Sequence, residues 1–452
     1  MIPLTLQQIA AYLGGRLVGE DATITNVSTD SKNVTKDTLF IALIGERFDA
    51  HQFVAQALEC ATAAVVSQAI ETNKSYILVD DTKRALGLLG KLVISQLSLF
   101  KFAITGSCGK TTVKEMLNSI MSNEHNTLAT AGNFNNDIGA PLTMLRFGPE
   151  QQVGIFELGA NHQHEIDYTS GLVEPDVALV NNIGAAHIEG FGSLQGVAQA
   201  KSEIYKHLGS QGVAVLNADD AFYPFLKQQA SHCRNLSFGL SASAQVRAQN
   251  LQADELARYQ FELCYGEQRQ PVKLQLNGKH QVLNALAAAA MAIAADVSLE
   301  VIAKGLQALQ AVSGRLLPHY FGGKTVIDDT YNANPTSVNA AIDVLAQSSV
   351  SMLILGDFAE LGDTTEAGHR QVGAYAKQQG IDFVLTLGSV SKYTSIMADG
   401  VHFEQLPALL NYLSDFLSKQ PQLTILVKGS RGARMERVIS ALKQQYQNGE
   451  WR

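Results

Sequence analysis

The stretch KFAITGSCGKTT, from Lys101 to Thr112, contains the pattern around which the rest of the chain is organised. Its apolar run at 102–104 predicts a buried strand, and a glycine-rich turn at 106–109 follows. From Lys110 onward the apolar residues recur at helical spacing, at Val113, Met116, Leu117, Ile120 and Met121. A strand, a glycine loop and a helix that begins with Lys-Thr form an arrangement that holds nucleotide phosphates, because backbone N–H groups and the helix N-terminus stabilise negative charge.

The spacing of this loop differs from the general phosphate-loop pattern G-x-x-x-x-G-K-[ST], whose first glycine would fall at Ile104. The alternative interpretation is a turn before an ordinary amphipathic helix. We favour the phosphate loop because strand, loop and helix all occur where the mechanism needs them. Lys110 is then expected to reach the β- and γ-phosphates, and the Thr111 hydroxyl to bind Mg²⁺.

The composition indicates a folded cytoplasmic protein. A chain of 452 residues suggests two to four domains, and 46% apolar with 17% charged residues is typical of a soluble protein with a large core. The net charge of −8 argues against a nucleic-acid-binding surface. No signal peptide or membrane-length apolar run is recognised. The cysteines lack a C-x-x-C pair, which argues against a disulfide framework; they are Cys60, Cys108, Cys233 and Cys264.

The pattern of expected elements divides the chain into units at 1–82, 83–314 and 315–452. The first unit is expected to contain a short helix at 4–13 and strands at 39–43, 63–67 and 76–79. Its loop GERFDAHQF, at 45–53, brings Arg47, Asp49 and His51 close together, although taken alone it is typical of a solvated loop.

In the central unit, two buried strands are each followed by a polar side chain. The strand at 153–156 leads to Glu157, and the strand at 177–181 leads to a segment that contains His187. Because ligands bind at the carboxyl edge of an open α/β sheet, both are candidate metal ligands, while a lone Glu or His is more often structural.

Three further segments of the central unit leave alternatives open. The Asn-rich loop TAGNFNNDIGAP, at 130–141, can offer amide donors to a ligand. Lys201, in AKSEIY, is expected to be exposed near the start of a helix, and the sequence alone favours a surface lysine. Asn284 begins an Ala-rich helix at 282–295 and faces the nucleotide or caps the helix. Residues 236–276 are expected to be antiparallel strands.

The third unit alternates strands with helices, which predicts a second, mainly parallel sheet. The strands are expected at 325–328, 352–355, 383–387 and 423–427, and the helices at 335–347, 366–379, 404–418 and 431–445.

Taken together, these motifs resemble the Mur ligase family, the ATP-dependent amide ligases of peptidoglycan precursor synthesis. The resemblance covers essentially the whole chain and is carried, in order, by TGSCGKTT, ELGANHQHEI, NNIGAAHIEGF, AKSEIY, GKHQVLN, GRL, DDTYNANPTS, LGDFAELG and VKGSRGARME. GERFDAHQF, TAGNFNNDIGAP and ELGANHQ are most similar to the branch that adds D-alanyl-D-alanine to UDP-N-acetylmuramoyl-tripeptide. The chain departs from the family pattern at Gln281, where Asn is frequent, and at Lys32, where Arg is usual.

The resemblance implies an α/β fold of three domains. These are a small N-terminal domain that binds the UDP substrate, a central P-loop domain with a parallel sheet, and a C-terminal Rossmann-like domain. The last would close over ATP and bind the amine acceptor. The implied enzyme is a monomer that uses ATP and two Mg²⁺ ions, or Mn²⁺.

The resemblance also implies a role for each matching residue. ATP would be held by Gly106, Ser107, Cys108, Gly109, Lys110, Thr111, Thr112, Asn284, Arg315 and Asp329. One metal would be bound by Thr111 and Glu157, and the second by His187 and a carbamylated Lys201. Lys110, His187, Lys201 and Arg315 would act in catalysis. The muramoyl substrate would contact Asp30, Ser31, Arg47, Asp49, His51, Asn133, Asn136 and Asp137.

Two classes of alternative remain at this stage. One is another ligase of the same fold, such as a diaminopimelate- or lysine-adding muramoyl ligase or folylpolyglutamate synthase. The other is a nucleotide-dependent binding protein without ligase chemistry.

Overall fold

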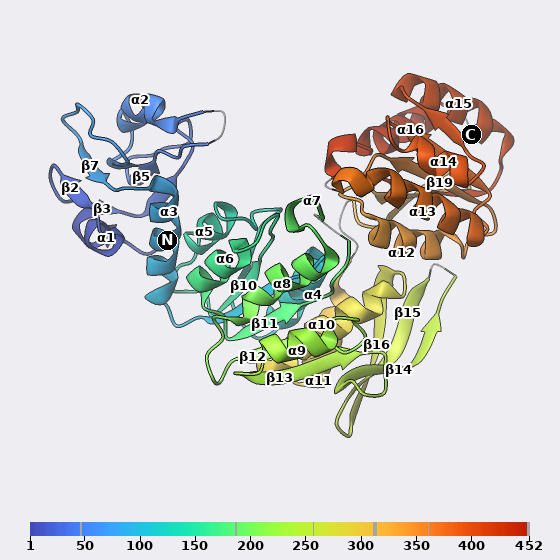
Figure 1. The fold of residues 1–452 in the computed structure, drawn as a ribbon, viewed down its shortest axis with the longest axis horizontal. Coiled ribbons are helices and arrows are strands. Elements are labelled where there is room, and N and C mark those ends of the chain that lie inside the picture. Colours follow the sequence, from blue (N-terminus) through green and yellow to red (C-terminus); the bar gives the residue numbers. More distant parts are fainter. Residues whose placement is uncertain (46–47, 186–187, 256, 311–313, 360, 450–452) are drawn as a thin grey trace.

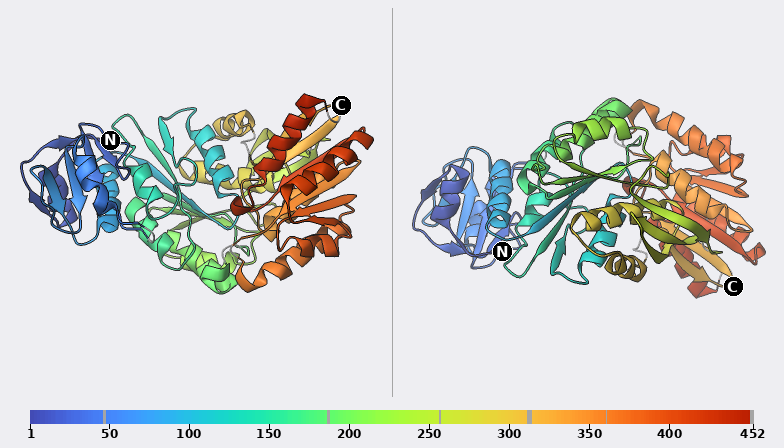
Figure 2. Two further views of the ribbon diagram at one scale, coloured as in Figure 1. Left: turned by 90° about the horizontal axis from the view of Figure 1, so that it is seen from above. Right: turned by 90° about the horizontal axis from the view of Figure 1, so that it is seen from below.

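The computed structural model describes residues 1–45, 48–185, 188–255, 257–310, 314–359 and 361–449. Three α/β units follow one another along the long axis of the molecule, with the N-terminus in the first and the C-terminus in the third (Figures 1 and 2). Among the described residues, none of the helices has the length and apolar composition that crossing a bilayer requires.

The first unit is built on a sheet with the strand order β2-β7-β6-β5-β4, in which only β2 runs antiparallel to its neighbour. Its elements are β1 (Leu4–Thr5), α1 (Leu6–Leu13), β2 (Arg16–Val18), β3 (Thr23–Ile24), β4 (Asn26–Ser28), β5 (Thr38–Ile41), a 3₁₀ turn (Ala50–Phe53), α2 (Val54–Leu58), β6 (Ala63–Val66), β7 (Ser75–Leu78) and α3 (Thr82–Ser95). The helix expected at 4–13 begins two residues later, because Thr5 and Gln8 form a capping box. Strands β1 to β4 are not predicted from the sequence, since they are two or three residues long.

Helix α3 joins the first unit to the second. Its apolar residues Leu86, Leu89 and Val93 pack in the core of the first sheet. The expected boundary between residues 82 and 83 falls at the beginning of this helix. The three domain ranges therefore stay predictions.

The central unit contains a nine-stranded sheet with the order β16-β15-β14-β13-β12-β11-β8-β10-β9. Its strands are β8 (Phe100–Thr105), β9 (Thr127–Ala129), β10 (Val153–Glu157), β11 (Val177–Val180), β12 (Val213–Asn217), β13 (Arg234–Gly239), β14 (Val246–Ala253), β15 (Arg258–Tyr265) and β16 (Gln268–Asn277). Neighbours from β9 to β14 are parallel, and β14 to β16 are antiparallel. The expectation of antiparallel strands at 236–276 is thus correct for β14 to β16, and wrong for β13, which pairs in parallel.

Helices cover both faces of the central sheet (Figure 1). They are α4 (Lys110–Met121), α5 (Gly139–Met144), α6 (Glu165–Val173), α7 (Ile188–Phe191), α8 (Leu194–Ser202), a 3₁₀ turn (Glu203–Tyr205), α9 (Tyr223–Gln229), α10 (His280–Ala294) and α11 (Leu299–Ala308). Helices α4, α10 and α11 share one core, and α5, α6, α8 and α9 share the core on the opposite face. Four consecutive buried alanines, at 287–290, give α10 a thin face that packs closely on α4.

The third unit has a sheet with the order β17-β18-β22-β19-β20-β21, parallel except at β17. Its elements are β17 (Leu317–Phe321), β18 (Lys324–Asp329), α12 (Pro335–Leu345), β19 (Ser351–Gly356), a 3₁₀ turn (Gly362–Thr364), α13 (Thr365–Gln378), β20 (Phe383–Leu387), α14 (Lys392–Met397), β21 (Val401–Phe403), α15 (Leu406–Lys419), β22 (Leu423–Lys428), a 3₁₀ turn (Arg431–Ala433) and α16 (Glu436–Asn448). The predicted parallel sheet is confirmed. The helix expected from residue 431 begins at Glu436, after the 3₁₀ turn.

Candidate active site

The phosphate loop lies between β8 and α4, where the sequence predicts it. Gly106 and Gly109 have φ angles of 154° and 79°, which residues with a Cβ atom rarely adopt. A Cβ at Gly109 would also lie 2.4 Å from Asn284 Oδ1. Both the backbone and the packing therefore require glycine at position 109.

Two asparagines at the end of β11 hold the loop in this shape. Asn182 accepts a hydrogen bond from the backbone N–H of Cys108 at 2.8 Å through Oδ1, and its backbone carbonyl accepts one from Ser107 at 3.0 Å. The side-chain amides of Asn181 and Asn182 both donate to the Cys108 carbonyl, at 2.9 and 3.1 Å. Sequence reasoning missed these two residues, although a pair of asparagines directly after a strand at the ligand edge was a usable signal.

The Asn284 side chain lies against the phosphate loop. Its Oδ1 accepts a hydrogen bond from Asn181 at 3.0 Å, and its Nδ2 donates to Gln281 Oε1 at 3.0 Å. Asn284 is the fifth residue of α10, so of the two alternatives the structure excludes a capping role. Gln281 stands where the family pattern more often has asparagine. Its hydrogen bond with Asn284 places its side chain next to a residue that lies against the phosphate loop.

Glu157 is positioned by two neutral donors. The Thr111 hydroxyl donates to Oε2 at 2.8 Å, and Asn135 Nδ2 donates to Oε1 at 2.9 Å. The Glu157 side chain is buried, with 2% of its residue surface exposed. A buried carboxylate beside a hydroxyl offers the oxygen ligands that Mg²⁺ prefers. Asn135 was not among the predicted site residues, although its neighbours in the Asn-rich loop were.

Among the residues that the structure describes, no cluster of three or more His, Cys, Asp or Glu side chains is placed to bind a metal. His187, another predicted ligand, lies outside the described residues. Of the predicted metal ligands, Thr111, Glu157 and Lys201 are described, and Thr111 and Glu157 are in hydrogen-bond contact.

Lys110 folds back over the phosphate loop. Its Nζ donates a hydrogen bond of 2.7 Å to the carbonyl oxygen of Gly106. The ammonium group therefore lies across the loop at the beginning of α4, where the helix N-terminus also favours negative charge.

The expectation that Lys201 is exposed is wrong. It lies in the last turn of α8, not at the start of a helix, and only 1% of its surface is exposed. Burial lowers the pKa of Lys201 to about 7, and the positive charge of Lys110 acts in the same direction. Its Nζ lies 5.7 Å from the centre of the Phe191 ring. No hydrogen bond or ion pair of Lys201 Nζ is found among the described residues.

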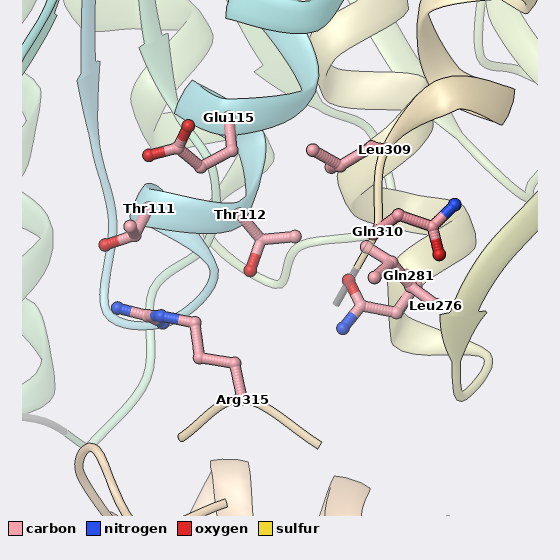
Figure 3. Close-up of a pocket in the computed structure, with 8 residues that line it drawn as sticks. All are labelled: Thr111, Thr112, Glu115, Leu276, Gln281, Leu309, Gln310 and Arg315. Atoms are coloured by element: carbon pink, nitrogen blue, oxygen red, sulfur yellow. The ribbon is translucent and has the colours of Figure 1, made fainter. Parts of the chain in front are cut away.

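A pocket beside the phosphate loop is lined by residues of the central unit and by Arg315 of the third unit (Figure 3). It is lined by Thr111, Thr112, Glu115, Leu276, Gln281, Leu309, Gln310 and Arg315. The guanidinium of Arg315 extends toward the first turn of α4, near Thr111 (Figure 3). Its Cζ lies 4.3 Å from the centre of the Tyr331 ring, at cation–π distance.

Asp329 stands at the end of β18 and is paired with Lys428. Its Oδ2 accepts from Lys428 Nζ at 2.5 Å, and its Oδ1 accepts from the backbone N–H of Leu316 at 3.3 Å. Lys428 Nζ also donates to the Asn332 carbonyl at 2.9 Å. The buried Lys428 was not among the predicted site residues.

The predicted substrate residues of the first unit lie in two turns. Asp30 Oδ1 accepts from the backbone N–H of Lys32 at 3.0 Å, which closes the turn that contains Ser31. Asp49 accepts from His51 twice, from the backbone N–H at 2.9 Å and the ring Nδ1 at 2.6 Å. These two hydrogen bonds lower the pKa of the Asp49 carboxyl. His51 Nε2 in turn accepts from the backbone N–H of residue 67 at 2.9 Å. Arg47 lies outside the described residues.

The predicted substrate residues of the central unit lie in the loop before α5. Asn136 Oδ1 accepts from the backbone N–H of Gly139 at 2.8 Å, and Asp137 forms an ion pair with Lys83 of α3. The Asn133 carbonyl accepts from the backbone N–H of Asn135 at 2.8 Å. The structure therefore connects this loop to the helix that leads in from the first unit, and contact with a substrate stays a prediction.

Comparison with known protein families finds two matches. Residues 104–292 match the Mur ligase middle domain, and residues 314–431 match the Mur ligase glutamate ligase domain. The first match contains the phosphate loop and Glu157, and the second contains Arg315 and Asp329.

Individual proteins are similar over nearly the whole chain. The UDP-N-acetylmuramoyl-tripeptide--D-alanyl-D-alanine ligase of Escherichia coli is 44% identical, over 98% of this chain and 99% of its own length. The crystal structure of MurF from Acinetobacter baumannii superimposes with a TM-score of 0.94 at 38% identity, covering 98% of this chain and 99% of that one. MurF from Thermotoga maritima, in complex with ADP, has a TM-score of 0.85 at 25% identity and covers 94% and 98%.

Proposed function

This chain belongs to the Mur ligase family, and from that premise we propose that it joins D-alanyl-D-alanine to UDP-N-acetylmuramoyl-tripeptide in peptidoglycan precursor synthesis, with conversion of ATP to ADP. The observation that carries this function is the 44% identity, over 98% of the chain, to a ligase of that name. The phosphate loop and the pocket beside Arg315 supply the matching chemistry.

The reaction proceeds in two displacements. A carboxylate is a poor electrophile, so the terminal carboxylate oxygen of the tripeptide attacks the γ-phosphorus of ATP, and ADP leaves. The acyl phosphate that forms is attacked at its carbonyl carbon by the free amine of D-alanyl-D-alanine. The amide bond forms, the amine gives up a proton, and inorganic phosphate leaves.

Phosphoryl transfer depends chiefly on positioning and charge neutralisation. We assign these tasks to Lys110, Thr111 and Arg315. Lys110 exchanges the Gly106 carbonyl for a phosphate oxygen, because an ammonium interacts more strongly with an anion than with a neutral carbonyl. Arg315 approaches from the third unit and adds a second cation at the γ-phosphate (Figure 3).

The donor set of the site fits Mg²⁺. The buried carboxylate of Glu157 and the hydroxyl of Thr111 are in hydrogen-bond contact, and both would bind the ion. We propose that His187 and a carbamylated Lys201 hold a second ion. Lys201 suits carbamylation, because that reaction needs a neutral amine and burial lowers its pKa. Bound magnesium would neutralise charge on the phosphates.

The three units divide the substrates among them. We propose that residues 1–82 bind the UDP moiety, residues 83–314 bind ATP and residues 315–452 bind the amine acceptor. The acyl phosphate hydrolyses readily, so the site must exclude water when the third unit closes over it. The turns around Asp30 and Asp49 and the loop that contains Asn133 and Asn136 would contact the muramoyl substrate.

One experiment tests this assignment against other ligases of the family. Phosphate release is measured with UDP-muramoyl-dipeptide and with UDP-muramoyl-tripeptides carrying diaminopimelate or lysine, each with and without D-alanyl-D-alanine, D-alanine or free diaminopimelate. We expect turnover only with a tripeptide, and kcat/KM for D-alanyl-D-alanine at least about a hundredfold above that for a single amino acid, because a site built for a dipeptide leaves polar groups unpaired with a shorter acceptor. Preference for a single amino acid would refute the named acceptor. ATP binding without acceptor-dependent turnover would refute ligase activity.

A further inference from the structure

Residues Gly314 to Leu316 connect the central unit to the third, and this short segment is fastened to the third unit on both sides of Arg315. The N–H of Gly314 donates to Asp328 Oδ2 at 3.1 Å, and its carbonyl accepts from the N–H of Tyr331 at 3.2 Å. On the other side, the N–H of Leu316 donates to Asp329 Oδ1. The Leu316 side chain is buried in the core of the third unit.

The backbone on either side of Arg315 is bent into the left-handed region. Gly314 has a φ of 75° and Leu316 a φ of 53°. The second value is unfavourable for a residue with a Cβ, and such conformations persist where surrounding contacts determine them. Here those contacts are the hydrogen bonds to the two aspartates at the end of β18. The segment is thus held in a shape that the chain would not adopt by itself.

Asp328 is the buried member of the two aspartates, with 5% of its surface exposed. Its Oδ1 accepts from the N–H of Thr330 at 3.2 Å and from the Thr330 hydroxyl at 2.7 Å, while Oδ2 accepts from Gly314. Both oxygens therefore have partners, and none of these partners is a cation. The carboxylate is buried and its hydrogen-bond partners among the described residues all lie within the third unit or the segment that leads into it, so its contacts point to a role through the backbone of Gly314.

We propose that Asp328 is a positioning residue, which fixes the backbone at Gly314 so that the guanidinium of Arg315 is presented to the γ-phosphate. The inference rests on the proposed function, because it takes the γ-phosphate to be the group that Arg315 contacts. Among the described residues, the contacts that fasten the segment around Arg315 lie in the third unit, at Asp328, Asp329, Tyr331 and the buried Leu316. Arg315 is therefore expected to move with the third unit.

The consequence is a coupling between domain position and phosphate contact. Without the hydrogen bond to Asp328, the N–H of Gly314 loses its acceptor and the segment can relax from its left-handed conformation. Arg315 would then sample many positions, even with the third unit in place. Affinity for the γ-phosphate would fall, whereas affinity for ADP, which lacks this group, would change little.

Calorimetric binding of ADP and of the non-hydrolysable β,γ-methylene analogue of ATP, both with Mg²⁺, separates these effects. The variants are Arg315→Ala, Asp328→Ala, Asp328→Asn and the double variant of the two alanines. Thr330→Val is the matched control, because it removes the hydroxyl contact to Asp328 Oδ1 and leaves the contact to Gly314 in place. The melting temperature of each variant reports folding independently of binding.

We expect Arg315→Ala to lower the preference for the ATP analogue over ADP at least about tenfold, the effect of one lost charge-assisted hydrogen bond. Asp328→Ala should lose most of the same preference, and the double variant should lose no more than Arg315→Ala alone, as expected for residues that act as a unit. Asp328→Asn should lose less than Asp328→Ala, because its amide oxygen can still accept from Gly314. Thr330→Val should keep the preference.

The outcomes separate the two ideas. If Arg315→Ala itself keeps the preference, the proposed phosphate contact of Arg315 is wrong. If Arg315→Ala loses it and Asp328→Ala keeps it, or if the two effects add in the double variant, the positioning role of Asp328 is refuted. If Asp328→Ala does not fold, Asp328→Asn decides. A full preference in that folded variant would contradict the proposal, because a partial loss is expected there, and a loss in Thr330→Val as large as that in Asp328→Asn would contradict it as well.

Discussion

The side-chain nitrogen of Asn334 lies 3.3 Å from the sulfur of Cys108, although the two residues are 226 positions apart in the chain. Cys108 belongs to the phosphate loop of the central unit, and Asn334 caps the N-terminus of α12 in the third unit by accepting from the Ser337 N–H at 2.8 Å. The third unit therefore touches the phosphate loop directly. The same unit carries Arg315, so one body both approaches the loop and supplies a cation to it.

Lys110→Ala should reduce kcat by about 10²–10³-fold or more while the protein stays folded, because removing one group that stabilises transition-state charge has this effect. Its Nζ contacts only the Gly106 carbonyl among the described residues, so folding should change little. The measurement is phosphate release, with the melting temperature taken alongside.

Lys114→Met is the matched control four residues later on the same helix. The buried Lys114 donates to the Thr130 carbonyl at 2.6 Å and pairs with Glu115 at 2.9 Å. Its loss should lower the free energy of unfolding by about 1–3 kcal/mol, the cost of an unsatisfied buried partner, with a far smaller effect on kcat than Lys110→Ala. Near-normal turnover in a folded Lys110→Ala protein would remove the phosphate loop from the active site.

Glu157→Gln should raise the Mg²⁺ concentration that gives half-maximal activity at least about tenfold, because a neutral amide is a weaker ligand for a hard cation than a carboxylate. Titration of activity with Mg²⁺ and Mn²⁺ measures this. His187→Ala is predicted to shift the same curve, with the larger effect for Mn²⁺, which suits imidazole better. Glu124→Gln, at an exposed position, is the control. A metal dependence that is unchanged in Glu157→Gln would contradict the assignment.

Lys201→Ala should lose most activity, and added formate or acetate should restore part of it. The reason is that an unmodified ammonium beside bound Mg²⁺ would be repelled, whereas a carbamate supplies anionic oxygens. The measurement is turnover of Lys201→Ala with increasing formate, with wild-type protein and Lys110→Ala as controls that formate should not activate. Full activity of Lys201→Ala without added carboxylate would show that this lysine is dispensable.

Protonation of His369 should destabilise the third unit at acid pH. Its ring is fully buried, stacks on Phe358 and accepts the Phe358 backbone N–H at Nε2, and burial lowers the pKa of His369 to about 4. As the pH falls, His369 in the unfolded state takes up a proton near pH 6.5, whereas the buried His369 of the folded state takes it up only near pH 4. The stability linked to this group is therefore complete above pH 6.5 and is lost as the pH falls toward 4.

The size of this loss is about 3 kcal/mol, from a shift of roughly two and a half pKa units. Urea unfolding of wild type and His369→Gln at pH 7.5 and pH 4.5 measures it. The variant should be less stable at pH 7.5, and its stability should fall less between the two pH values. An equal fall in both proteins would exclude His369 as the titrating group.

The local architecture around the phosphate loop can be predicted from the amino-acid sequence alone. The spacing of apolar residues predicts strand β8 and helix α4. The glycines of the loop between them predict a turn, because its backbone conformation is one that only glycine adopts easily. The position of Glu157 at a strand end was equally visible, because the carboxyl ends of parallel strands share one edge. These features depend on residues that are neighbours in the chain.

Which distant residues meet depends on how the helices and strands pack together. Lys201 was expected at the surface, and it is buried because α8 packs with the helices on its face of the central sheet. Asn135 reaches Glu157 across 22 positions, and Asn182 reaches Cys108 across 74. The hydrogen bond from the Gly314 N–H to Asp328 depends on the pairing of β17 with β18. Periodicity in a sequence indicates that a helix or strand has a buried face, but the partner that covers it, and the polar groups that then meet, are set by the packing of whole elements.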